Sequence, residues 1–159
     1  MESRMSSHIP ASKTIFIGSD HAGFALKADL VAHLQSLDLI VKDCGTNSGP
    51  NNVVEPCDYP VAAQKVCREV LANEGIGILV CGSGIGMSIA ANRQRGVRAA
   101  LCTHEFHARG CRAHNNANII CLGERVTAPA LARELVEIFL KTPFEGGRHE
   151  RRLDLIEED

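Results

Sequence analysis

A cysteine followed by a run of glycines is the part of the sequence best suited to chemistry. Residues 81–88 read Cys-Gly-Ser-Gly-Ile-Gly-Met-Ser. The glycines let the backbone come close to a ligand, and their N–H groups can bind an anion or a developing oxyanion. A helix beginning directly after the turn would place its positive N-terminal end beside Cys81 and favour the thiolate. Cys81 is therefore a candidate general base, with Ser83 beside it.

Two other interpretations fit this turn less well. A dinucleotide-binding G-x-G-x-x-G motif needs a glycine where Met87 stands, and no acidic residue ends the strand expected at 97–102. A tight turn without a ligand would need only one or two glycines and would not need polar Ser83 and Ser88. Four other cysteines are expected to pack as small hydrophobic residues. They are Cys44, Cys67, Cys102 and Cys121.

A second polar segment, Gly18-Ser-Asp-His-Ala-Gly23, follows the first expected strand. Its spacing is that of a nucleotide P-loop, but Phe24 and Ala25 stand where Lys and Ser or Thr would be needed, which excludes that reading. Asp20 and His21 can instead form a carboxylate–imidazole pair, or bind a sugar hydroxyl and a phosphate. The alternative for Asp20 is a helix N-cap.

Four potential metal ligands share one face of the helix expected at 104–114. They are His104, His107, Cys111 and His114. Ten residues of helix extend over about 15 Å, whereas ligand bonds to zinc are about 2 Å long. One ion cannot reach all four, so no metal is expected and a polar helix face with one useful histidine is preferred.

The segment near the C-terminus contains a basic cluster that follows two glycines. Arg148 and Arg152 are four residues apart, so a helix would point them the same way and they could clamp one phosphate. A solvated basic face balanced by Glu157, Glu158 and Asp159 is equally consistent with the spacing.

Alternating elements must position these residues. Short apolar runs predict strands at residues 14–18, 39–43, 76–81, 97–102 and 118–122. Amphipathic stretches predict helices at 22–37, 59–73, 86–92, 104–114 and 128–141, with a charged segment from 148 onward. This order predicts an α/β three-layer sandwich, a Rossmann-like doubly wound sheet of five parallel strands. The irregular stretch 45–58 is longer than an ordinary connector and is a candidate lid or pocket wall.

Composition limits the classes of function. The chain has 159 residues and a formal net charge of -2, so we expect one domain at 14–159 that binds small molecules rather than nucleic acid or membrane. Seven cysteines, an odd number, indicate free thiols in a reducing compartment, most simply the cytoplasm. Residues 1–13 are polar, with no apolar segment, and are expected to be a disordered tail.

Taken together, the motifs closely resemble those of the type B ribose-5-phosphate isomerase family over residues 14–152. The motifs concerned are Gly18-Ser-Asp-His21, Asp58-Tyr-Pro60, the run from Cys81 to Asn92, Gly96-Val-Arg-Ala-Ala100, His114-Asn-Asn-Ala-Asn118 and Arg148-His-Glu-Arg-Arg152. The resemblance implies a metal-free and cofactor-free enzyme of the pentose phosphate pathway that interconverts ribose 5-phosphate and ribulose 5-phosphate. Relatives that isomerise allose 6-phosphate or galactose 6-phosphate belong to the same family, and a sugar-phosphate-binding domain without turnover is the non-enzymatic alternative.

The resemblance also implies roles for the glycine turn. Cys81 would move the proton from C2 to C1 through a cis-enediolate, and Ser83 would relay a proton between O1 and O2. The turn amides implied to hold the oxyanion belong to Gly82, Gly84 and Gly86. Some family members use an acidic residue after the turn, at position 87 here. This chain has the cysteine instead and resembles the cysteine class.

Further roles implied by the resemblance concern the sugar ring and the phosphate. His114, helped by Asp20, would open the furanose ring, and Asn115 would bind the enediolate. The implied phosphate ligands are His21, Arg125, Arg148 and Arg152.

Topology adds an expectation about how these residues meet. Cys81 and Asp20 follow strands and so lie at the carboxyl edge of the sheet, whereas His114 and Asn115 precede a strand and lie at the amino edge. The helix between these edges is about 16 Å long. We therefore expect a homodimer, or a dimer of dimers, in which His114 and Asn115 complete the site of the partner subunit.

Overall fold

Five apolar stretches form parallel strands in the part of the chain that the computed structural model describes, residues 13–158. They are β1 (Ile15–Ser19), β2 (Val41–Asp43), β3 (Ile76–Cys81), β4 (Ala99–Leu101) and β5 (Ile119–Gly123). The order across the sheet is β2-β1-β3-β5-β4. β1, β3 and β5 are buried along their whole length, as their nearly continuous apolar sequence requires. The predicted doubly wound five-stranded sheet is confirmed.

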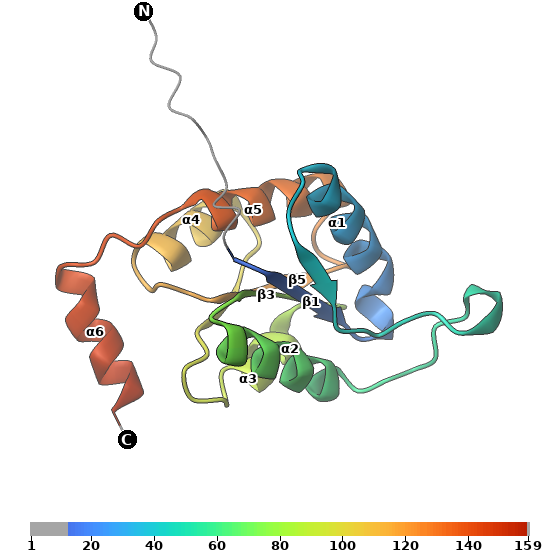
Figure 1. Cartoon of the computed structure of the whole chain (residues 1–159), viewed down its shortest axis with the longest axis horizontal. Helices are drawn as coiled ribbons and strands as arrows, with labels where there is room; N and C mark the ends of the chain where they lie inside the picture. The colour runs from blue at the N-terminus through green and yellow to red at the C-terminus, as the bar shows by residue number, and fades with distance from the viewer. Residues whose placement is uncertain (1–12, 159) are drawn as a thin grey trace, which may run out of the picture.

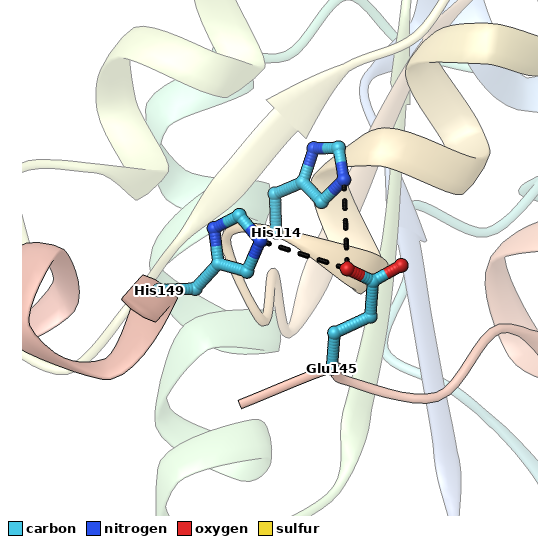
Figure 2. A group of neighbouring side chains, drawn as sticks. All are labelled: His114, Glu145 and His149. Atoms are coloured by element: carbon cyan, nitrogen blue, oxygen red, sulfur yellow. Dashed lines mark ion pairs between the residues drawn. The ribbon is translucent and has the colours of Figure 1, made fainter. Parts of the chain in front are cut away.

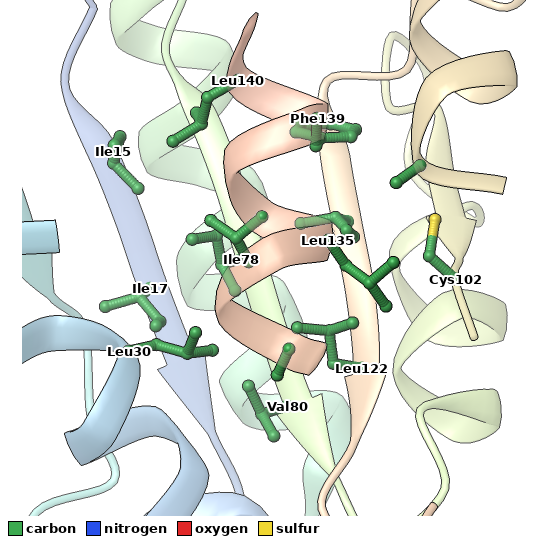
Figure 3. Packing of buried hydrophobic residues seen from close by; sticks show 14 of the residues in the cluster. Ile15, Ile17, Leu30, Ile78, Val80, Cys102, Leu122, Leu135, Phe139 and Leu140 are labelled. Carbon is green, nitrogen blue, oxygen red and sulfur yellow. The ribbon is translucent and has the colours of Figure 1, made fainter. Parts of the chain in front are cut away.

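Helices cover both faces of this sheet (Figure 1). The helices on one face are α1 (Phe24–Ser36), α4 (Glu105–Ala113) and α5 (Pro129–Lys141), and those on the other are α2 (Tyr59–Asn73) and α3 (Ile85–Ala91). Figure 3 shows the first core, where Ile17, Ile78 and Leu122 of the strands meet Leu30 and Leu135 of the helices. The fold therefore has the three layers expected from the sequence.

Alternation along β3 decides which layer its side chains join. Ile78 and Val80 belong to the core under α1 and α5, whereas Leu79 and Cys81 belong to the core under α2 and α3. The order in which the strands are added to the sheet changes direction at β1, because β2 lies on one side of β1 and β3 lies on the other. The carboxyl ends of β1 and β3 thus border the crevice where open α/β sheets bind ligands.

Element boundaries agree with the sequence predictions to within two residues, and β3 and α2 agree at both ends. The first predicted helix is divided, because Asp20 Oδ1 accepts a hydrogen bond from Gly23 N–H at 3.1 Å and a short 3-10 turn, η1 (His21–Gly23), precedes α1. The edge strand β4 is shorter than predicted. Arg98 N–H donates to Asn118 Oδ1 at 2.8 Å instead of extending the strand ladder.

Two segments project from the sandwich in Figure 1. The stretch 45–58 contains one short 3-10 turn, η2 (Pro50–Asn52), and extends outward from the carboxyl edge. The last helix, α6 (Arg148–Glu157), lies beside the sandwich, where Glu157 Oε1 accepts from Arg98 Nη1 at 3.1 Å.

The predicted polar tail, residues 1–13, lies outside the described residues except for Lys13. Between residues 13 and 158 the chain contains no helix with the length and apolar character needed to cross a membrane.

Candidate active site

The glycine turn holds Cys81 at the end of β3 through its own backbone. Gly84 N–H donates to Cys81 Sγ at 3.1 Å, and Ile85 N–H donates to Ser83 Oγ at 3.2 Å. Only 5% of Cys81 is exposed. The turn thereby fixes the position of the sulfur of the predicted base at the end of β3.

Two glycines are required for this turn to fit against β5. Gly84 has a φ of 79°, and a Cβ there would lie 2.9 Å from the backbone carbonyl carbon of Leu122 in β5. A Cβ on Gly123 would lie 2.5 Å from the carbonyl carbon of Ser83. Side chains are excluded at both positions, because real Cβ atoms do not approach other atoms so closely.

The chain that follows β5 is hydrogen-bonded to the same turn. Glu124 N–H donates to the Cys81 carbonyl at 2.9 Å, and Arg125 N–H donates to the Gly82 carbonyl at 3.0 Å. The Arg125 guanidinium consequently lies against Gly82, where an added Cβ would be 3.1 Å from Nη1. A cation is thereby fixed next to the glycine turn.

The end of β1 brings Asp20 and His21 to the same place. Asp20 is buried and its Oδ1 caps η1, as the N-cap interpretation predicted. Nδ1 of His21 lies 3.1 Å from the backbone nitrogen of Cys57 and 3.2 Å from its carbonyl oxygen, so it accepts from the one or donates to the other according to its tautomer. When Nδ1 accepts, the ring proton is on Nε2, which can donate to an anion.

These residues line one cavity of about 390 Å³ at the carboxyl edge, which we call the turn site. Its lining residues are Asp20, His21, Ala22, Tyr59, Cys81, Gly82, Ser83, Gly86, Arg125 and Val126. The volume is within the range of cavities that hold small ligands. An acid–base sulfur, an imidazole and a guanidinium around one cavity suit an anionic substrate that loses a carbon-bound proton.

The other predicted site residues lie elsewhere in the subunit. His114 is the C-cap of α4, and it and Asn115 line a separate cavity of about 280 Å³ with Leu101, Phe106 and Cys111 among its other residues. Arg148 and Arg152 are exposed on α6. None of these four residues lines the turn site.

Comparison with known proteins identifies the family. The model of the family described as Ribose/Galactose Isomerase matches residues 15–156. The chain belongs to this family of isomerases. Ribose-5-phosphate isomerase B of Escherichia coli is 42% identical over 145 residues, which cover 91% of this chain and 94% of that protein. The resemblance found in the motifs is confirmed.

Solved structures agree with this assignment. A ribose 5-phosphate isomerase from Thermotoga maritima has a TM-score of 0.87 and 49% identity, covering 93% of this chain and 99% of that chain. Ribose-5-phosphate isomerase B from Mycoplasma genitalium, solved with bound ribulose-5-phosphate, has a TM-score of 0.84 and 42% identity, covering 92% and 95%.

Sequence reasoning did not include two residues that shape this isomerase's turn site. Tyr59 lines the cavity, and its ring lies so close to Gly86 that an added Cβ would be 2.8 Å from it. Glu124 Oε2 accepts from Leu26 N–H at 2.9 Å near the start of α1 and thereby links β5 to α1. The Asp58-Tyr-Pro60 motif at a helix start was a signal for Tyr59. Nothing local in the sequence indicated Glu124.

The four cysteines that were expected to pack as small hydrophobic residues differ from Cys81 in their surroundings. Cys67, Cys102 and Cys121 are buried, and Cys44 is half-buried. Burial raises the pKa of Cys67 to about 11 and raises that of Cys121 well above its usual value. A hydrogen bond with Cys111 raises the pKa of Cys102 as well. These thiols are neutral near pH 7, in agreement with their expected role as packing residues.

The histidine-rich face of α4 does not converge on one point. The rings of His104 and His107 have centroids 3.8 Å apart and planes tilted by 32°, and Cys111 Sγ lies 4.0 Å from Cys102 Sγ. His114 instead faces Glu145 and His149, as Figure 2 shows. We call this group of three residues the histidine cluster.

Proposed function

We propose that this isomerase interconverts ribose 5-phosphate and ribulose 5-phosphate through a cis-enediolate, as a step of the pentose phosphate pathway. The observation that carries the proposal is the sulfur of Cys81, held by Gly84 N–H at the edge of a cavity that also contains His21 and Arg125. An aldose phosphate needs such a base for its C2 proton and cations for its phosphate.

The proposed proton transfer uses the residues around this cavity. Cys81 removes the proton from C2 and returns it to C1, while Ser83 passes a proton between O1 and O2. The amides of Gly82 and Gly86 stabilise the negative charge that develops on the enediolate oxygen, while Gly84 N–H, the third amide expected there, holds the Cys81 sulfur. His21 and Arg125 bind the phosphate at the far end of the substrate.

A second subunit supplies the rest of the site in this proposal. His114 of the partner subunit opens the furanose ring with the help of Asp20, and the partner's Asn115 binds the enediolate. The partner's Arg148 and Arg152 join the phosphate. Their exposure on α6, away from the turn site of their own chain, supports this division. The assembly is then a symmetric homodimer, or a dimer of such dimers.

Substrate length is tested by comparing three sugars with the purified enzyme. We expect kcat/KM for ribose 5-phosphate to exceed the values for allose 6-phosphate and galactose 6-phosphate by at least about tenfold, since a cavity matched to one length discriminates by 1–3 kcal/mol. A preference for either hexose would assign the enzyme to the hexose branch of the family. Binding of all three without turnover would leave only a sugar-phosphate-binding domain.

Three further points belong to this proposal. Residues 14–159 act as one catalytic domain, and no metal takes part, so activity should survive exhaustive chelation. Stoichiometric zinc whose removal abolishes turnover would contradict this point. We also place the enzyme in the cytoplasm, where a reducing environment suits its seven free cysteines.

A further inference from the structure

The histidine cluster brings three potential metal ligands together outside the turn site (Figure 2). Oε2 of Glu145 lies 3.9 Å from Nε2 of His114 and 3.6 Å from Nε2 of His149. The two imidazole rings are stacked, with centroids 4.6 Å apart and planes 18° from parallel. The potential ligand atoms of all three residues lie within 4.8 Å of one another.

Backbone contacts, rather than the three side chains themselves, create this arrangement. Glu145 N–H donates to the Ala113 carbonyl at 3.0 Å, which fixes Glu145 beside the end of α4. Gly146 and Gly147 have φ values of 66° and 58°, and they turn the chain so that α6 starts next to the same point. His149, in the first turn of α6, is 5% exposed. The backbone therefore brings the three residues together before any ligand arrives.

Two imidazoles and one carboxylate are a ligand set that proteins use for zinc. Tetrahedral zinc with bonds of about 2.0–2.1 Å needs its ligand atoms about 3.3 Å apart, whereas the atoms here lie within 4.8 Å of one another. The two stacked rings must also turn so that their nitrogen lone pairs meet at one ion. The side chains of His114 and Glu145 are 46% and 58% exposed, so they can make these movements around the buried His149. The fourth coordination position would belong to water.

Charges around the cluster limit the expected affinity. Arg109 and Lys141 line the same cavity as His114 and Glu145, and both repel a cation. Lys141 is neutralised in part by Glu137, whose Oε2 accepts from Nζ at 2.7 Å. We therefore expect a dissociation constant for zinc on the order of micromolar, weaker than that of structural zinc sites.

We propose that the histidine cluster is a site for a divalent transition metal such as zinc, and that the bound metal inhibits the isomerase. Inhibition follows because Nε2 of His114 becomes a metal ligand and no longer exchanges protons with a sugar. This inference rests on the proposed role of His114 in ring opening. The cyclic aldose phosphate needs that step. The ketose phosphate does not, because its C5 oxygen is esterified and cannot close a furanose ring.

The first measurement is binding of zinc to the chelator-treated full-length enzyme by calorimetry. We expect one zinc per chain in the wild type. Glu145→Gln and His149→Asn should each weaken binding at least tenfold, whereas His104→Asn, a change of an exposed histidine outside the cluster, should leave it unchanged. Glu145→Gln alters an exposed side chain and keeps the test valid if His149→Asn unfolds the protein. Zinc binding of equal strength in all four proteins would overturn the proposal and place the ion elsewhere, for example on cysteines.

The second measurement is inhibition in the two directions of the reaction. Saturating zinc should slow turnover of ribose 5-phosphate at least about fivefold more than turnover of ribulose 5-phosphate, and a chelator should restore both rates. Cluster-dependent binding with no inhibition in either direction would refute the inhibitory role. Cluster-dependent inhibition that is equal in both directions would support the metal site and contradict ring opening by His114. The two proposals can thus fail separately.

Discussion

The turn site and the histidine cluster are built in opposite ways. Cys81 is buried, and its turn is fixed by backbone hydrogen bonds from the ends of β3 and β5. His114 is exposed at the C-terminal end of α4, and the residues next to it belong to the segment that leads away from the sandwich into α6. A base must be positioned to within a fraction of an ångström of a carbon-bound proton, and backbone hydrogen bonds such as those of the turn site provide that rigidity. Groups that complete a site in another subunit, as proposed for His114, must instead be exposed on the surface of their own chain.

The largest expected effect tests the turn site directly. Cys81→Ala removes the proposed base and should lower kcat for ribose 5-phosphate at least about 10²-fold while leaving ligand binding intact. The matched control is Cys67→Ala, the same change at a buried thiol of α2 whose pKa of about 11 keeps it neutral. Its kcat should stay near that of the wild type. Full turnover by the Cys81→Ala enzyme in a steady-state assay would remove Cys81 from the mechanism.

A second variant tests whether the backbone support matters. Gly123→Ala would place a Cβ 2.5 Å from the carbonyl carbon of Ser83, so the turn must shift. We expect a loss of about 1–3 kcal/mol in the free energy of unfolding, as for overpacked cores, together with a lower kcat. Gly49→Ala is the control, because the nearest atom to its Cβ would be 3.6 Å away. Equal urea midpoints for the two variants would show that the turn tolerates displacement.

The third prediction concerns the division between subunits. Cys81→Ala and His114→Ala chains that exchange at random form half heterodimers, and each heterodimer has one doubly damaged and one intact site. Activity with the cyclic sugar should then recover to about a quarter of the wild-type value. If verified exchange gives only the mean of the two parent activities, each site is complete within one chain, and the assignment of His114 to the partner is wrong.

The sequence predicted the turn site better than the histidine cluster, for a physical reason. Cys81 and its glycines are contiguous, and the end of an apolar strand places them at the carboxyl edge whatever the rest of the chain does. The cluster depends on tertiary contacts between His114 and a distant segment, through the bond from Glu145 N–H to the Ala113 carbonyl. Periodicity along α4 could exclude a shared metal on that helix, but it carried no information about Glu145 or His149.

The hydrogen bonds that join the residues after β5 to the glycine turn could not be predicted from the sequence either. The N–H groups of Glu124 and Arg125 bind the turn only because β3 and β5 are neighbours in the sheet, and the apolar pattern does not determine strand order. Arg125 entered the candidate site through the family resemblance alone. The identities of the five strands and of helices α1 to α5, in contrast, follow from local periodicity and were predicted correctly, whereas the short 3-10 turns η1 and η2 were not predicted.

The smallest effect is expected from an ion pair that contacts neither region. Arg133 Nε on α5 donates to Asp29 Oδ2 on α1 at 2.7 Å, and this hydrogen bond holds the pKa of Asp29 below its usual value of 3.8. Because the unfolded chain binds the proton more readily, the stabilisation is complete above the usual pKa and is lost as pH falls through the lowered folded pKa. Asp29→Asn should therefore lower Tm by no more than about 3 °C at pH 6, and the difference should shrink below about pH 4. The kcat should not change, because both regions keep their contacts. A difference in Tm that is the same at pH 6 and pH 3 would show that packing, not the ion pair, is what the substitution removes.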